Sequence, residues 1–163
     1  MAFTIRETMA GFQPIAVTDT VQNHALGTIV KGFDPTYGEC EFIYLTGVAS
    51  TVIGDVVSYN STLGATVRWA GTANEGRPLA VAMSANVASQ YGWYQIGGNA
   101  VVNTSGTLAA GNPVYWQATA TLSATAVAGK QVLGAVAAGA NGTPSTNKTV
   151  INIDRPHSQG AIT

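Results

Sequence analysis

The stretch that decides the fold reads LGTIVKGF (residues 26–33), DPTYG (34–38) and ECEFIYLT (39–46). The two outer segments are rich in β-branched and aromatic residues, which favour strands. The middle segment places Pro35 and Gly38 close together, and such clusters form turns. The stretch therefore predicts two antiparallel strands joined by a tight turn.

Short strand patterns continue to the end of the chain. Further strands are predicted at residues 55–59, 65–69, 79–83, 93–96, 100–103, 113–117, 119–123, 131–137 and 149–154. The 19 glycines and 6 prolines fall mostly between these segments, where turns are expected. No convincing amphipathic helix interrupts them. We therefore expect an all-β fold, a small β-barrel or sandwich of short strands.

The sequence also contains a weak internal repeat. GDVVSYN (54–60) resembles GNPVYWQ (111–117), 57 residues further along the chain. Each copy is followed by two more short strands, at 65–69 and 77–82 or at 119–123 and 130–135. One β-hairpin-plus-strand unit, used twice and packed face to face, would explain the pattern. Chance similarity among strands rich in Gly and Val would explain it equally well.

The two ends of the chain lack the strand pattern. Residues 1–25 are predicted to form an extended arm, because Pro14 blocks a helix and the apolar residues follow no regular face. Residues 26–155 form the β-rich domain, and residues 156–163 form a C-terminal tail.

Charge is the unusual feature of the composition. Only 9% of the 163 residues are charged and 46% are hydrophobic, whereas about 25% are charged in ordinary soluble domains. A monomer with so few charges is poorly protected against association, so we expect an assembly to cover much of the surface. The net charge of −1 and the lack of a Lys/Arg cluster argue against nucleic acid and anionic membranes as partners.

The sequence contains no arrangement typical of an active site. His24 and His157 lie far apart and have no metal-ligand spacing with Cys, Asp or Glu. No nucleophile elbow and no phosphate loop is present. Glu39 and Glu41 share one face of a predicted strand, which indicates a solvated face rather than a catalytic pair. We therefore predict a protein that is not an enzyme, with no catalytic, metal-binding or cofactor-binding residues.

The most distinctive local feature is the aromatic run YGWY (91–94). Trp93 and Tyr94 fall on opposite faces of a predicted strand, so one is expected to fill the core and the other to pack at a subunit contact. In the alternative interpretation, Trp93 forms a sugar-stacking platform with Trp69 and Trp116, as in carbohydrate-binding modules.

Three segments carry a family resemblance: FDPTYGECEFIYLTGVAS (33–50), PLAVAMSANVASQYGWYQI (78–96) and the closing IDRP (153–156). They resemble small phage structural proteins that are encoded near the major capsid protein and regarded as capsid cement or head-decoration proteins. The resemblance implies a β-rich fold, a homotrimer and binding to the major capsid protein. It places the protein on the outer surface of the virion, after assembly in the host cytoplasm.

The resemblance leads us to expect a virion structural protein that stabilises the capsid shell. The arm at residues 1–25 is expected to add as a strand to an exposed sheet edge on the capsid protein. A virion-displayed carbohydrate-binding module and a tail component of the same virus are the alternatives. The residues predicted to contact the shell or a neighbouring subunit are Phe3, Ile5, Phe12, Ile15, Trp93 and Tyr94.

Overall fold

A computed structural model describes residues 4–5, 13–60, 64, 66–68, 72–117 and 120–161 of the chain. These residues form strands, turns and loops, so the all-β expectation is confirmed. No helix among them is long and apolar enough to cross a membrane.

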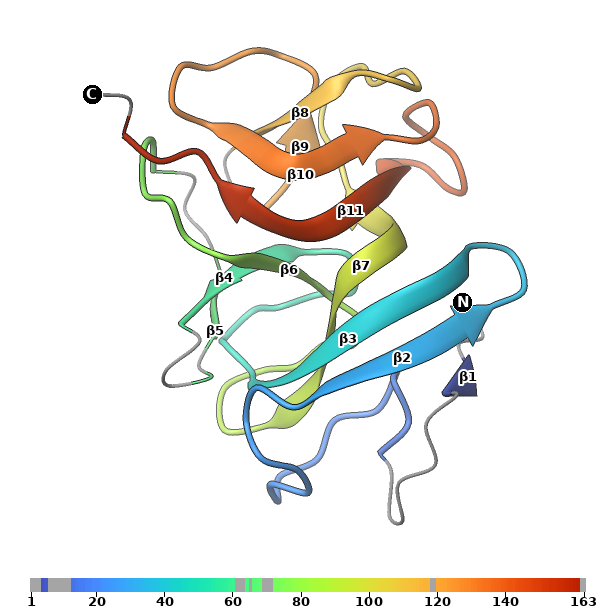
Figure 1. Cartoon of the computed structure of the whole chain (residues 1–163), viewed down its shortest axis with the longest axis vertical. Helices are drawn as coiled ribbons and strands as arrows, with labels where there is room; N and C mark the ends of the chain where they lie inside the picture. The colour runs from blue at the N-terminus through green and yellow to red at the C-terminus, as the bar shows by residue number, and fades with distance from the viewer. Residues whose placement is uncertain are drawn as a thin grey trace.

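The described residues form one antiparallel sheet of eleven strands, which curls into a half-barrel (Figure 1). The main path runs in the order β1-β2-β3-β7-β11-β10-β8-β9, and β4, β5 and β6 branch from β7. The strands are β1 Thr4–Ile5, β2 Ile29–Asp34, β3 Gly38–Thr46, β4 Val56–Tyr59, β5 Thr66–Arg68, β6 Leu79–Ala82, β7 Tyr91–Asn103, β8 Pro113–Trp116, β9 Leu122–Ser123, β10 Gln131–Ala137 and β11 Lys148–Ser158.

The hairpin predicted from residues 26–46 is confirmed as β2 and β3. Their register pairs Asp34 with Gly38 next to the turn. The turn is held by Asp34, whose Oδ1 accepts hydrogen bonds from the backbone N–H groups of Thr36 (2.7 Å) and Tyr37 (3.1 Å). Gly38 closes the turn with a φ of +81°, which suits glycine.

The long strand β7 is the centre of the fold. The sequence predicts two strands here, at 93–96 and 100–103, and the structure corrects this to one strand that continues through Gly97 and Gly98. Gly98 has a φ of +88°, so the strand bends at this glycine instead of ending. The first half of β7 pairs with β3 and the second half with β11. The bend therefore joins the half of the sheet that contains β3 to the half that contains β11.

The internal repeat is confirmed in the topology. In the first unit β4 pairs with β5 and β6, and in the second unit β8 pairs with β9 and β10. The third strand of each unit then pairs with a long strand, β6 with β7 and β10 with β11. Each unit is thus a hairpin plus one strand added to the opposite edge of the first strand.

The turn that opens each unit is also held in the same way. The Oδ2 atom of Asp55 accepts from the backbone N–H of Val52 (3.1 Å), and the Oδ1 atom of Asn112 accepts from that of Ala109 (2.9 Å). The glycine before the Asp or Asn has a positive φ in both copies, +90° and +84°. The two copies share one backbone frame, although their sequences agree at few positions.

The largest core cluster lies between the two units. It takes side chains from β4 and β6 of the first unit, from β8, β9 and β10 of the second, and from β7 and β11. The expected face-to-face packing is therefore present, and Trp116 is fully buried within it. Strand β11 alternates in the same core, since Ile151 and Ile153 are buried while Asn152 is exposed.

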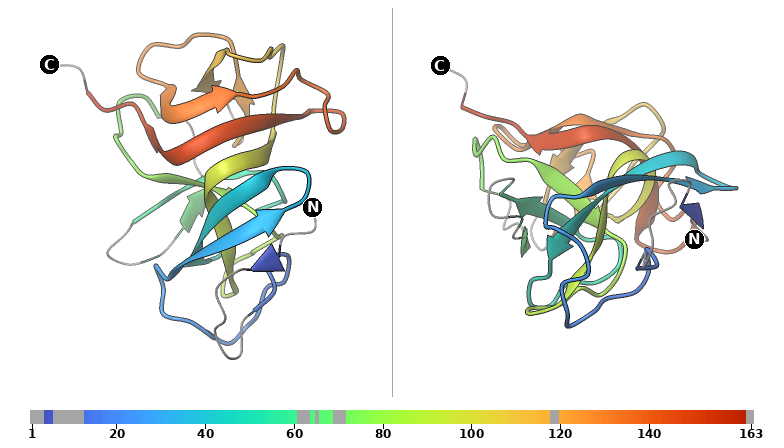
Figure 2. Two further views of the ribbon diagram at one scale, coloured as in Figure 1. Left: turned by 45° about the vertical axis from the view of Figure 1, so that its right-hand side comes forward. Right: turned by 60° about the horizontal axis from the view of Figure 1, so that its bottom comes forward.

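The structure corrects the predicted boundaries at both ends. Residues 13–25 lie against the sheet below β2 and β3 (Figure 2), and Ile15 is only 5% exposed in the cluster around Tyr44 and Trp93. They therefore belong to the domain and not to an arm. At the other end, β11 runs on to Ser158, whose backbone N–H donates to Arg77 O (2.9 Å). Residues 156–158 thus belong to the sheet and not to a tail.

Candidate functional site: a charged groove over the central strand

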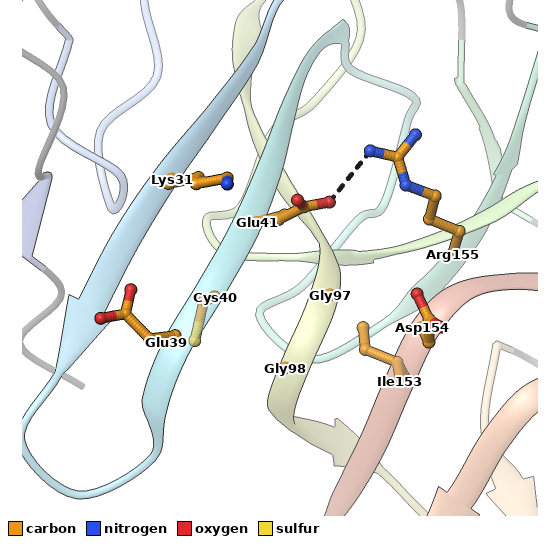
Figure 3. A pocket seen from close by; sticks show the side chains of 9 residues that line it. All are labelled: Lys31, Glu39, Cys40, Glu41, Gly97, Gly98, Ile153, Asp154 and Arg155. Atoms are coloured by element: carbon orange, nitrogen blue, oxygen red, sulfur yellow. Dashed lines mark hydrogen bonds and ion pairs between the residues drawn. The ribbon is translucent and has the colours of Figure 1, made fainter.

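A groove of about 490 Å³ lies over the bend of β7, between β3 and β11 (Figure 3). The chain has seven Lys and Arg and eight Asp and Glu residues, and five of these fifteen line this one groove. In a protein so poor in charge, this concentration makes the groove the candidate site. The residues that line it are Lys31, Glu39, Cys40, Glu41, Gly97, Gly98, Ile153, Asp154 and Arg155.

The floor of the groove consists of the two glycines at the bend. Gly97 is paired in register with Glu41 on one side and with Asp154 on the other. Because Gly97 has no side chain, the side chains of Glu41 and Asp154 flank an open space. A larger residue at position 97 would place its own side chain between them. The hollow thus follows directly from the sequence Gly97-Gly98.

Gly98→Ala is expected to destabilise the protein by about 2–3 kcal/mol. A Cβ atom there would lie 2.2 Å from the backbone oxygen of Glu39, and the left-handed φ alone costs about 1–2 kcal/mol for other residues. Gly139→Ala is the matched control, because no atom lies within 4 Å of its added Cβ. Urea unfolding measures both variants. Equal midpoints for the two would contradict this account of the groove floor.

The wall on β11 is shaped by a bulge. The register between β10 and β11 shifts between Leu133 and Ala135, and a Cβ on the intervening Gly134 would lie 2.5 Å from Asp154 O. As a result, two consecutive residues, Asp154 and Arg155, are both exposed on the groove side of the strand. The bulge therefore adds a second charge to a wall where simple alternation would place one.

The charges of the groove are partly compensated. A guanidinium nitrogen of Arg155 lies 3.1 Å from a carboxylate oxygen of Glu41, with side chains 61% and 30% exposed. Such a solvated pair contributes only about 0–1 kcal/mol. Lys31 is the cross-strand neighbour of Glu41. Burial raises the pKa of nearby Tyr59, and the charge of Arg155 lowers it again in part.

Asp154 is the groove carboxylate that this pairing does not compensate. Within the part of the chain that the structure describes, its side chain has no hydrogen-bond or ion-pair partner. The described residues that line the groove include three carboxylates and two cationic groups, which sum to a formal charge of −1. It can therefore accept a cationic group without a further anion being needed.

Cys40 also lines the groove, but its thiol is not a reactive group. The residue is 3% exposed, and burial raises the pKa of the thiol to about 11, with Asp34 and Glu39 adding to the effect. Only the thiolate is a nucleophile, so alkylation of the folded protein at neutral pH should be slow.

The raised pKa of Cys40 predicts a loss of stability in alkaline solution. Between the pKa of the unfolded thiol, about 8.5, and the folded value of about 11, the unfolded chain has lost a proton that the folded chain keeps. Stability therefore falls as pH rises through this window, by on the order of 3 kcal/mol. Urea unfolding at several pH values measures the loss. Cys40→Ala should lack this part of it, and identical losses in both proteins would contradict the assignment.

The structure does not bring the predicted contact residues together on a surface. Trp93 and Tyr94 are both fully buried, and Ile15 is 5% exposed, so these three side chains lie in the core of the single chain. Both faces of β7 are covered: Trp93 packs in one core cluster and Tyr94 in another. Phe3 and Phe12 lie outside the described residues, and Ile5 is paired through its backbone with Gly32 on β2.

The sugar-stacking platform is also corrected. It requires exposed, coplanar tryptophans, but Trp93 and Trp116 are both fully buried, and Trp69 lies outside the described residues. The indole N–H of Trp93 instead donates to Gln13 O (2.9 Å). These tryptophans are core residues.

Sequence reasoning missed Lys31, Asp154 and Arg155 as site residues. Glu39 and Glu41 were expected to form a solvated face, which agrees with their partial exposure but does not reveal the groove. The available signals were the consecutive glycines at 97–98 and the charged pair within IDRP (153–156). Neither signal shows that β3 and β11 meet on opposite sides of one glycine.

The fold and the groove define an all-β protein with a mixed-charge surface site. Among the described residues, no group of three or more His, Cys, Asp or Glu side chains is placed to hold a metal ion. No model of a protein family, no curated protein and no solved structure matches this chain.

Proposed function

We propose that this protein is a decoration (cement) protein that binds the outer surface of a phage capsid as a homotrimer and stabilises the shell. The main observation that supports this proposal is a surface with few charges and many apolar groups. Eight large apolar side chains of the described residues are exposed, in a chain with only 9% charged residues. Such a surface suits burial in an assembly better than permanent exposure to water. The resemblance of residues 33–50 and 78–96 to phage cement proteins supports the same proposal.

The proposed mechanism is additional contact between neighbouring capsid subunits. DNA packaging loads the contacts between capsomers, and a compact β-domain that bridges them adds contacts without altering the shell. In a trimer the contacts act together, and linking even two sites raises avidity by about 10²–10⁴. The major capsid protein is the partner in this mechanism.

The N-terminal segment is proposed to add to a sheet edge of the capsid protein. Since residues 13–25 are packed on the domain, the proposed clamp is limited to the residues before Gln13. The pairing of Thr4 and Ile5 with β2 supports this idea, because it gives the segment a strand conformation at a sheet edge of its own chain.

The test is to mix the purified protein with expanded empty capsids and image the shells. We expect ordered protrusions with the full chain, and at least about a tenfold loss of affinity after deletion of residues 2–12. The deletion variant must keep its circular dichroism spectrum, which is the control for folding. Bare capsids with the full chain would refute the proposal. Undiminished binding by the deletion variant would refute the clamp alone.

The tail-component alternative predicts a different result in the same preparation. Isolated tails should then bind the protein while expanded heads do not. The carbohydrate-binding alternative has no supporting observation in the described residues, because the tryptophans it depends on at positions 93 and 116 are buried.

A further inference from the structure

The groove over Gly97 and Gly98 is large enough to receive a long side chain. Its volume, about 490 Å³, is within the range of pockets that hold small ligands, about 300–1,000 Å³. The floor and the rim of the groove differ in chemical character. Gly97 and Gly98 form an uncharged floor without side chains, while Glu41, Asp154 and Arg155 supply charge at the rim (Figure 3).

The charges of the groove indicate which side chain fits. Arg155 already pairs with Glu41 (3.1 Å), and Asp154 has no partner among the described residues. An acidic ligand would meet a site of formal charge −1 and be repelled. A cationic side chain would compensate Asp154. Lysine and arginine also carry apolar stems, which would cover the glycine floor.

We propose that this groove binds a basic side chain, arginine or lysine, of the protein partner, with Asp154 as its anchor. The inference deepens the proposed function and rests on it, since the partner is then the capsid protein. Arginine suits the site best because its planar guanidinium binds a carboxylate through two parallel hydrogen bonds. Glu41 lies on the opposite side of Gly97 and is the second acceptor within the groove.

The first test uses the protein without capsids. N-acetyl-arginine amide is titrated into the labelled full chain, and the NMR signals of the Gly97 and Gly98 amides are followed. We expect saturable shifts of both signals with the arginine probe and none with N-acetyl-citrulline amide, its neutral analogue. Asp154→Asn should abolish the shifts. No saturable shift, or the same shift in the variant, would overturn the inference.

The second test measures binding to expanded empty capsids. Asp154→Asn should weaken binding about tenfold at low salt, and this loss should shrink as salt is added, because salt screens exposed charge pairs. Glu75→Gln is the matched control, since Glu75 pairs with Arg77 (3.6 Å) and does not line the groove. It should bind like the unmodified protein.

The two proposals fail in different ways. If the unmodified protein decorates capsids and Asp154→Asn decorates them equally well at low salt, the groove inference is wrong while the decoration function stands. If the unmodified protein does not bind capsids, the decoration function is wrong, and so is the capsid protein as the partner that binds in the groove. A melting temperature of Asp154→Asn close to that of the unmodified chain shows that the change acts on binding.

Discussion

Deletion of residues 2–20 is expected to destabilise the protein by about 4–6 kcal/mol. The deletion removes Ile15, whose burial contributes about 1.5–3 kcal/mol. It also removes Gln13, which accepts hydrogen bonds from the indole N–H of Trp93 (2.9 Å) and from the hydroxyl of Tyr44 (2.9 Å). A buried donor that loses its acceptor costs about 1–3 kcal/mol. The loss approaches the whole stability of a typical domain, about 5–15 kcal/mol.

The shorter deletion of residues 2–12 is the matched control, because it keeps all of these contacts. Thermal unfolding followed by circular dichroism should give a melting temperature far lower for the longer deletion than for the shorter one. The melting temperature of Gln13→Ala in the full chain should lie between those of the two deletions. This variant keeps Ile15 and the main-chain oxygen that accepts from Trp93, but it loses the side-chain oxygen that accepts from Tyr44. Equal melting temperatures for the two deletions would contradict the assignment of residues 13–25 to the domain.

Asp55→Ala is expected to cost about 3–5 kcal/mol, because the buried carboxylate accepts three hydrogen bonds, and a hydrogen bond to a charged group contributes about 1.5–3 kcal/mol. Its side chain is 2% exposed and lies 2.9 Å from the Nε of Arg68. The other oxygen, Oδ1, accepts from Asn103 Nδ2 (2.9 Å), and Oδ2 also accepts from Val52 N. Asp55 thus ties β4 to β5, to β7 and to its own turn.

The second unit provides the control for this substitution. Asn112 occupies the same turn position as Asp55 and accepts from Ala109 N (2.9 Å). Asn112→Ala should therefore lose only the turn contact, about 1 kcal/mol. Urea unfolding of the two variants separates the contribution of the turn from that of the buried charge. An Asp55→Ala loss no larger than that of Asn112→Ala would contradict the role given to the ion pair.

Local features of the fold were predictable from the sequence because they depend on neighbouring residues. The turn at 34–38 follows from the short side chain of Asp34 and the conformational freedom of Gly38, and the alternation around Ile151 and Ile153 follows from the two-residue period of a strand. The repeat was visible because each copy keeps a glycine and an Asp or Asn at its opening turn.

The groove and the fate of the aromatic run were not predictable, because they depend on pairings between distant segments. Glu41, Gly97 and Asp154 come from three strands that are more than 50 residues apart in sequence. Likewise, an alternating strand normally has one exposed face, so one of Trp93 and Tyr94 was expected at the surface. Both are buried because residues 13–25 cover one face of β7 and the first repeat covers the other.

Because the two repeats share one backbone frame, comparing residues at equivalent positions shows which side chains the turn does not require. At the opening turn, Val52 and Ile53 in one copy stand where Ala109 and Ala110 stand in the other. The second copy folds into the same turn with two methyl groups, so the larger pair is not demanded by the turn. Val52 and Ile53 are nevertheless 51% and 46% exposed to solvent. The geometry of the turn alone therefore does not explain the two bulky aliphatic residues at this tip.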